Sequence, residues 1–169
     1  MESDKMFTKE DFMEMSEDEL IEVLNENNLS EYEFEALIKA RELKGLNGSI
    51  IKVSDFDSQE AKVIREYIEY HNQFPYLCSG QIPQKELKKF NQDLFKNSAS
   101  LEDKKRALIV LGHTADIFAY KSLKKYIKRP DSDLKIWANM AFQECQDFLK
   151  SDLTNRPIIN ITNLNQLSR

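Results

Sequence analysis

The sequence predicts an all-α fold with about seven helices, and three observations support this class. Glycine and proline total only eight of the 169 residues, which is fewer than the turns of a β-sandwich or barrel require. Helix-favouring Leu, Lys, Glu and Ala dominate the middle of the chain. Helix start signals recur, and apolar residues follow each of them at spacings of three and four.

Capping boxes mark the first two predicted helices. In a capping box a Ser hydroxyl accepts from the backbone N–H three residues on, and the acidic residue there reaches back. Ser16 with Glu19 opens one helix, and Ser30 with Glu33 opens a second that ends near Gly45. Two more helices are predicted over 57–72 and 83–95. The stretch 46–57 is short and β-branched; we interpret it as a connector, with an extended segment as the alternative. The Pro- and Gly-containing stretch 73–83 is predicted to be a loop.

Residues 107–111 are five consecutive apolar residues, a pattern shared by buried strands and buried helices. The charged run 102–106 precedes them without any alternation, which favours a helix from Ser100 to Gly112. Because residues 107–111 are apolar around the whole helix circumference, we expect neighbours to cover the helix on more than one side. A sixth helix follows, capped by Thr114 or Asp116, and a seventh runs from 133 to 150.

A shift of 31 residues aligns the apolar run 107–111 with residues 138–142, which indicates a helical repeat. The segment "DKKRALIVLGHTADIFAYKSLKKYIKRPDSDLKIWANMAF" resembles short HEAT-like repeats over about residues 101–150. Lys135 stands where such repeats usually carry Arg. The residues that carry the resemblance are Arg106-Ala107, Leu111-Gly112, Asp116, Leu123 with Ile127, and Pro130-Asp131.

The resemblance implies a short right-handed α-solenoid in the C-terminal half, with an irregular helical cap formed by the N-terminal part. We predict a single helical domain over 1–153, divided into an irregular part (1–97) and HEAT-like repeats (98–153). Residues 154–169 form a C-terminal tail, which we expect to be loosely ordered; an extended arm that docks is the alternative. Repeats of this kind mostly act as protein-binding scaffolds, and some bind nucleic acid or assist enzymes.

Composition limits the location of the chain. No apolar run approaches the roughly 20 residues of a membrane span, and the acidic N-terminus lacks the apolar core of a signal peptide. Cys78 and Cys145 have no paired spacing, so we expect two buried free thiols rather than a disulfide or metal motif. These features predict a cytoplasmic protein.

Charge is distributed unevenly along the chain. The net charge of −5 is the sum of −10 over residues 1–42, +1 over 43–97 and +4 over 98–169. An ordinary solvated helix surface is one interpretation of the basic run near residue 125. The other is a binding face for an acidic protein segment or for the chain's own residues 1–42. Its predicted partner-binding residues are Lys121, Lys124, Lys125, Lys128 and Arg129, with Phe118 or Tyr120 as an aromatic anchor.

Catalytic motifs are not evident. His113 and Asp116 are the best acid–base pair, but both fall in an interhelical turn, where structural roles are common; His71 falls near a helix end. We predict no catalytic, metal-binding or cofactor-binding residues. The expected function is a non-enzymatic scaffold or adaptor that binds an acidic protein through a concave basic face. A nucleic-acid-associated HEAT-like protein, disfavoured by the negative net charge, and an enzyme-assisting factor centred on His113 and Asp116 are the alternatives.

Overall fold

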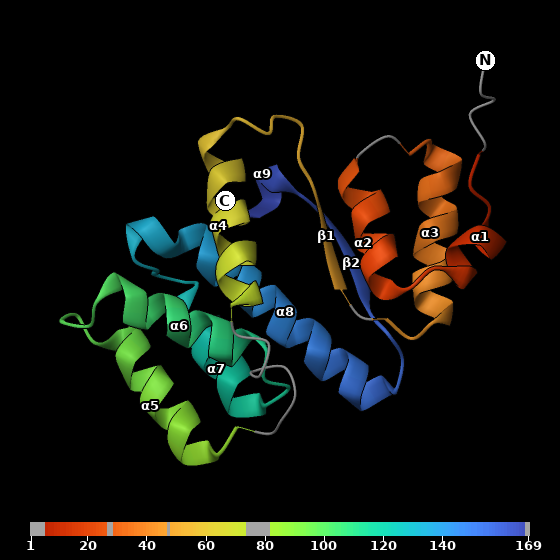
Figure 1. Ribbon diagram of the computed structural model, residues 1–169. Coiled ribbons are helices and arrows are strands. Elements are labelled where there is room, and N and C mark those ends of the chain that lie inside the picture. Colours follow the sequence, from red (N-terminus) through yellow and green to blue (C-terminus); the bar gives the residue numbers. More distant parts are fainter. Residues whose placement is uncertain (1–5, 27–28, 47, 74–81, 168–169) are drawn as a thin grey trace.

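The computed structural model describes residues 6–26, 29–46, 48–73 and 82–167. Most of these residues are helical, which confirms the helical class, and two short strands pair between the helices (Figure 1). No helix in these ranges combines the length and apolar composition that crossing a bilayer requires. The elements in chain order are α1 (Lys9–Glu14), α2 (Glu17–Glu26), α3 (Glu31–Leu43), β1 (Gly48–Lys52), α4 (Gln59–Asn72), α5 (Gln84–Phe95), α6 (Leu101–Gly112), α7 (Ile117–Tyr126), the 3-10 turn η2 (Ser132–Leu134), α8 (Lys135–Thr154), β2 (Ile159–Asn163) and α9 (Leu164–Leu167).

Serine caps start the helices at the predicted capping boxes. The hydroxyls of Ser16, Ser30 and Ser100 each accept a hydrogen bond from the backbone N–H three residues on. The carboxylate of the acidic residue at that position accepts a second bond from the backbone N–H of the serine. Helix α4 begins at Gln59, two residues after the predicted start at 57, because Ser58 caps it. The short helices α1 and α9 were not predicted.

Helix α6 lies at the centre of the larger hydrophobic core. Residues 107–111 are all buried, and α5, α7 and α8 each contact α6. The apolar run is therefore a helix covered on more than one side, as its composition predicted. Helix α8 completes the cover with Trp137, Ala138 and Ala141, which are fully buried.

Helices α6 and α8 approach closely where α6 ends. A Cβ built on Gly112 would lie 3.0 Å from the Cα of Ala141 and 3.1 Å from its carbonyl oxygen. Both contacts are with backbone, which cannot move aside as a side chain does. Gly112 is thus required by the spacing of the two helices, beyond its predicted role in ending α6.

Two hydrophobic clusters divide the described residues. Helices α4 and α5, which belong to the segment 1–97, pack into the same cluster as α6, α7 and α8. Helices α1 to α3 form the smaller cluster, and Figure 1 shows them on the other side of the two strands from α7. The buried residues of this smaller cluster are Phe12, Leu20, Ala36, Leu37 and Ala40.

A two-stranded parallel sheet corrects two predictions. Strand β1 lies in the stretch 46–57 that we interpreted as a connector, and β2 lies in the tail that we expected to be loosely ordered. The register pairs Gly48 with Ile159 and Lys52 with Asn163. The tail is therefore an extended arm that docks, which was the alternative.

Side chains on the two faces of the sheet hold it between the two clusters. Ile51 packs against the larger core, while the Lys52 ammonium lies 4.8 Å from the ring centre of Phe34 in α3. Thr162 of β2 is buried. The strands thus join the α1–α3 helices to the rest of the molecule.

The contact at Gly112 predicts a strong effect of one added methyl group. Gly112→Ala should lower the free energy of unfolding by about 1–3 kcal/mol, because the backbone of α8 must shift to admit the Cβ. Urea denaturation measures this loss. Gly48→Ala is the matched comparison and should cost less, since its nearest neighbour is the end of the Arg41 side chain at 3.1 Å. Equal stability of Gly112→Ala and the native chain would contradict the close approach.

Candidate functional site

Helix α7 presents the predicted basic residues to solvent. The Asp116 carboxylate caps the helix by accepting from the backbone N–H groups of Phe118 (2.7 Å) and Ala119 (3.1 Å). Ala119, Leu123 and Tyr126 are buried on the inner face, so the opposite face points outward. Its exposed basic residues, with the turn that follows, are Lys121, Lys124, Lys125, Lys128 and Arg129.

The basic face of α7 borders two different neighbours. The Lys124 ammonium lies 5.6 Å from the ring centre of Tyr120, and the Tyr120 ring lies 5.4 Å from that of Phe142 in α8. The Lys125 ammonium instead lies 4.9 Å from the ring centre of Phe95 in α5. Lys124 therefore belongs to the α8 side of α7, and Lys125 belongs to the α5 side.

The two predicted aromatic anchors are half-buried. Phe118 and Tyr120 both pack against the larger core. Tyr120 contacts Phe142, and Phe142 also lines a groove along α8. Tyr120 is thus the better placed of the two to support a bound partner.

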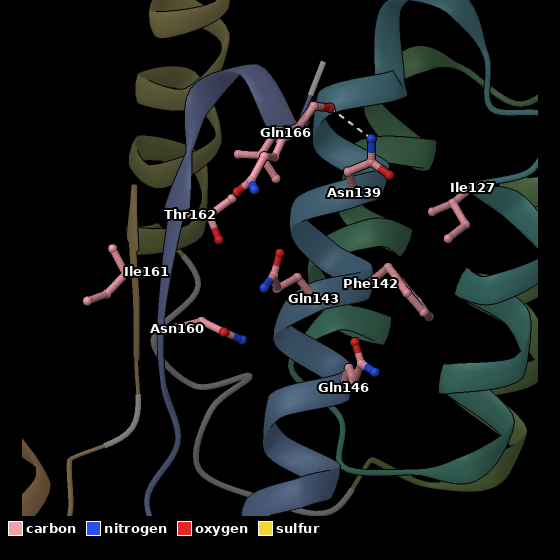
Figure 2. A pocket seen from close by; sticks show the side chains of 10 residues that line it. Ile127, Asn139, Phe142, Gln143, Gln146, Asn160, Ile161, Thr162 and Gln166 are labelled. Carbon is pink, nitrogen blue, oxygen red and sulfur yellow. Dashed lines mark hydrogen bonds between the residues drawn. The ribbon is translucent and has the colours of Figure 1, made fainter. Parts of the chain in front are cut away.

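A groove of about 480 Å³ follows α8 (Figure 2). Helix α8 forms its floor, β2 and α9 form one wall, and Ile127 at the end of α7 stands on the other side. The residues that line it are Ile127, Asn139, Phe142, Gln143, Gln146, Asn160, Ile161, Thr162, Gln166 and Leu167.

Amide side chains give the groove its chemistry. The Asn139 amide donates to the carbonyl of Leu167 at 2.8 Å, and the Asn160 amide donates to the buried carboxylate of Asp147. These bonds fix the wall against the floor. The side-chain amides of the half-buried Gln143 and Gln146 have no hydrogen-bond partner in the described ranges, and each offers a donor and an acceptor to a ligand.

The structure places the predicted site beside the groove rather than in it. None of the seven predicted residues is among the lining residues, although Ile127 lies between Lys124 and Lys128 in the chain. The sequence did hold a signal for the floor, because Asn139, Gln143 and Gln146 fall at helical spacing and form an uncharged polar stripe. The wall was missed because the tail was expected to be loose.

A second polar cluster lies where α4, α6 and α8 meet. His113 donates from Nδ1 to the carbonyl of Ile109 at 3.0 Å, and its Nε2 lies 2.5 Å from Nε2 of His71. Glu144 accepts from the Tyr67 hydroxyl at 2.6 Å and lies 3.6 Å from His113 Nδ1. The sequence reasoning did not foresee that these four side chains converge.

Asp116 is not part of this cluster. Besides capping α7, it accepts from the side-chain amide of Gln84 at 2.9 Å. Asp116 and His113 thus have separate hydrogen-bond partners, and both take the structural roles that their position in a turn predicted. In the ranges that the structure describes, no group of three or more His, Cys, Asp or Glu side chains is arranged to hold a metal ion.

Burial controls protonation in the second cluster. Desolvation raises the pKa of Glu144 to about 7, against the opposing effect of the bond from Tyr67. Desolvation also lowers the pKa of His113 and raises that of Tyr67 well above its usual value. Cys145 is buried and free, as predicted, and desolvation raises its pKa to about 12; Cys78 lies outside the described residues.

The raised pKa of Glu144 predicts a pH-dependent stability. The contribution of the neutral Glu144 carboxyl to the free energy of unfolding is fully present below the unfolded pKa near 4.5. This contribution is lost as the pH rises through about 7, because the folded chain must then bury a charged carboxylate. Glu144→Gln keeps an acceptor for Tyr67 without the charge. The variant should match the native chain near pH 4 and exceed its stability by about 2–3 kcal/mol above pH 7.

Urea denaturation at pH 4, 5, 7 and 8 measures this difference. Glu86→Gln on the exposed surface of α5 is the control, and its effect should stay within about 0.5 kcal/mol at every pH. A Glu144→Gln effect that does not change with pH would contradict the burial of an ionisable carboxyl at this position.

Comparisons with known proteins find no matching family model, curated protein or solved structure. The HEAT-like resemblance over about residues 101–150 therefore stays a prediction.

Proposed function

We propose that this chain is a non-enzymatic interaction module that binds an acidic segment of a partner protein in the groove along α8. The observation that carries the proposal is the juxtaposition of an amide-lined groove with the basic face of α7. The HEAT-like stacking implied by the sequence is part of this proposal, since it would make this side of the molecule the concave face.

The groove suits a peptide because of its uncharged polar lining. A peptide backbone offers one donor and one acceptor per residue, and the side-chain amides of Gln143 and Gln146 match this pattern. Phe142 and Ile127 add apolar contact area between the polar groups. The volume of about 480 Å³ falls in the range of ordinary ligand pockets.

The basic face selects for acidic side chains in the ligand. Lys124 lies on the α8 side of α7, and Lys128 follows Ile127, which lines the groove. Exposed lysines attract an acidic segment over several ångströms and increase its association rate. The chain's own acidic helices α1 to α3 lie beyond the strands in Figure 1, so they do not cover this face.

Charge reversal tests the proposal. A random-peptide library displayed on phage and selected on the native chain should enrich peptides that carry several Asp or Glu residues. Lys124→Glu with Lys128→Glu should weaken the best peptide about five- to tenfold at low salt, and the loss should shrink as salt rises. Fluorescence anisotropy measures both quantities.

The matched control reverses two charges on another helix. Lys62→Glu with Arg65→Glu on the exposed face of α4 changes the net charge equally and should leave peptide affinity within about twofold. The proposal fails when the enriched peptides are not acidic, when both double variants weaken binding equally, or when a single-stranded RNA oligonucleotide binds more tightly than the acidic peptides.

A further inference from the structure

Strand β2 has one edge that no strand covers. In the described part of the chain the sheet contains only β1 and β2, so β2 is paired on one side. An uncovered edge presents main-chain N–H and C=O groups at every second residue.

The register identifies the uncovered groups. The N–H of Gly48 donates to the carbonyl of Ile158 at 3.1 Å, and Gly48 is paired with Ile159. In a parallel pair this arrangement turns the main-chain groups of Ile158, Asn160 and Thr162 toward β1. The groups of the alternate residues Ile159, Ile161 and Asn163 therefore point away from β1.

A contact in α9 supports this assignment independently. The N–H of Asn163 donates to the side-chain oxygen of Gln166 at 3.2 Å, and Gln166 lines the groove. The edge of β2 away from β1 is thus the edge that faces the groove. Ile161 lines the groove on this edge, and the register turns its main-chain N–H and C=O away from β1.

We infer that the acidic segment binds in extended form as a third strand along the edge of β2, hydrogen-bonded to the main chain of Ile159 and Ile161. The inference rests on the proposed function and adds the binding mode. Strand β1 does not offer the same site, because none of its residues lines the groove. Backbone pairing supplies affinity in such complexes, and pockets for alternate side chains supply selectivity.

Successive side chains of an added strand point to opposite faces of the sheet, so every second residue of the bound segment faces α8. Side chains that point toward α8 meet Gln143 and Gln146 on the floor, where small or polar groups fit. Side chains that point away from α8 remain at the surface, where the exposed Lys124 and Lys128 beside the groove attract acidic groups. The recognised segment therefore alternates small or polar residues with acidic ones.

A scan of backbone methylation tests the binding mode on the native chain. The probe is the tightest acidic peptide from the phage selection, resynthesised with one N-methyl group at each position in turn. Methylation should weaken binding about fivefold or more at alternate positions, where the N–H faces β2, and much less at the positions between them.

Amide hydrogen exchange gives a second readout with no mutation in the chain. The amide of Ile161 should exchange more slowly when the peptide is bound, because a strand then covers it. The amides of Asn160 and Thr162, which face β1, should keep their rates. Slower exchange at all three positions, or at none, contradicts strand addition.

A variant pair separates the main chain of Ile161 from its side chain. Ile161→Pro removes the N–H on the uncovered edge, where proline is tolerated, and Ile161→Val retains it. The proline variant should lose peptide affinity about fivefold at every salt concentration, and the valine variant should not. Should the proline variant fail to fold, the methylation scan and the exchange rates decide the question.

The two proposals fail in different ways. If lysine reversal lowers peptide affinity but the methylation scan shows no alternation, the groove is retained and strand addition is overturned. If the effect of methylation alternates along the peptide but lysine reversal does not change affinity, strand addition is retained and recognition of acidic side chains is overturned. Absence of any enriched peptide overturns both.

Discussion

Burial of the C-terminal half of α6 on all sides is the constraint on which the rest of the structure depends. The five consecutive apolar residues 107–111 leave this part of the helix with no face that water can solvate favourably. Helices α5, α7 and α8 therefore enclose it, and each must turn its own apolar stripe inward. The outward faces that remain are the basic face of α7 and the amide stripe of α8, so the same packing that makes the core also builds two sides of the groove.

Helix α8 serves both the core and the site. Trp137, Ala138 and Ala141 hold it against α6, with Gly112 permitting close contact. Its length carries it past α6, so that it also meets β2 through Asn160 and Asp147. Small movements of α8 would change the core and the groove together, which ties the rigidity of the floor to the packing of α6.

Local signals predicted the helices well. Capping boxes at Ser16, Ser30 and Ser100 act within four residues, and the apolar spacing of α6 and α7 is visible in any short window. The strands had a weaker signal: the stretch 46–57 and the tail each allowed an extended conformation, but each strand is five residues long and its partner lies far away in the chain. Pairing at that distance depends on where the helices bring the two segments, which no short window contains.

The candidate site was predicted only where its residues form a local sequence pattern. The lysines of α7 were found because charge at helical spacing is a local pattern. Gln143 and Gln146 carry no charge, so their stripe did not stand out, and the wall required β2. His71, His113 and Glu144 each suit their own helix, and only the crossing of three helices brings them together.

The parallel pairing of β1 with β2 also bears on the order in which the molecule assembles. Contacts between segments so distant in the chain carry a large entropic cost of loop closure and form late in folding. Helices α4 to α8 lie between the two strands and make most of their contacts with near neighbours. We therefore expect the helical core to consolidate first, and the recognition edge to become available only in the last step, when the molecule is already compact.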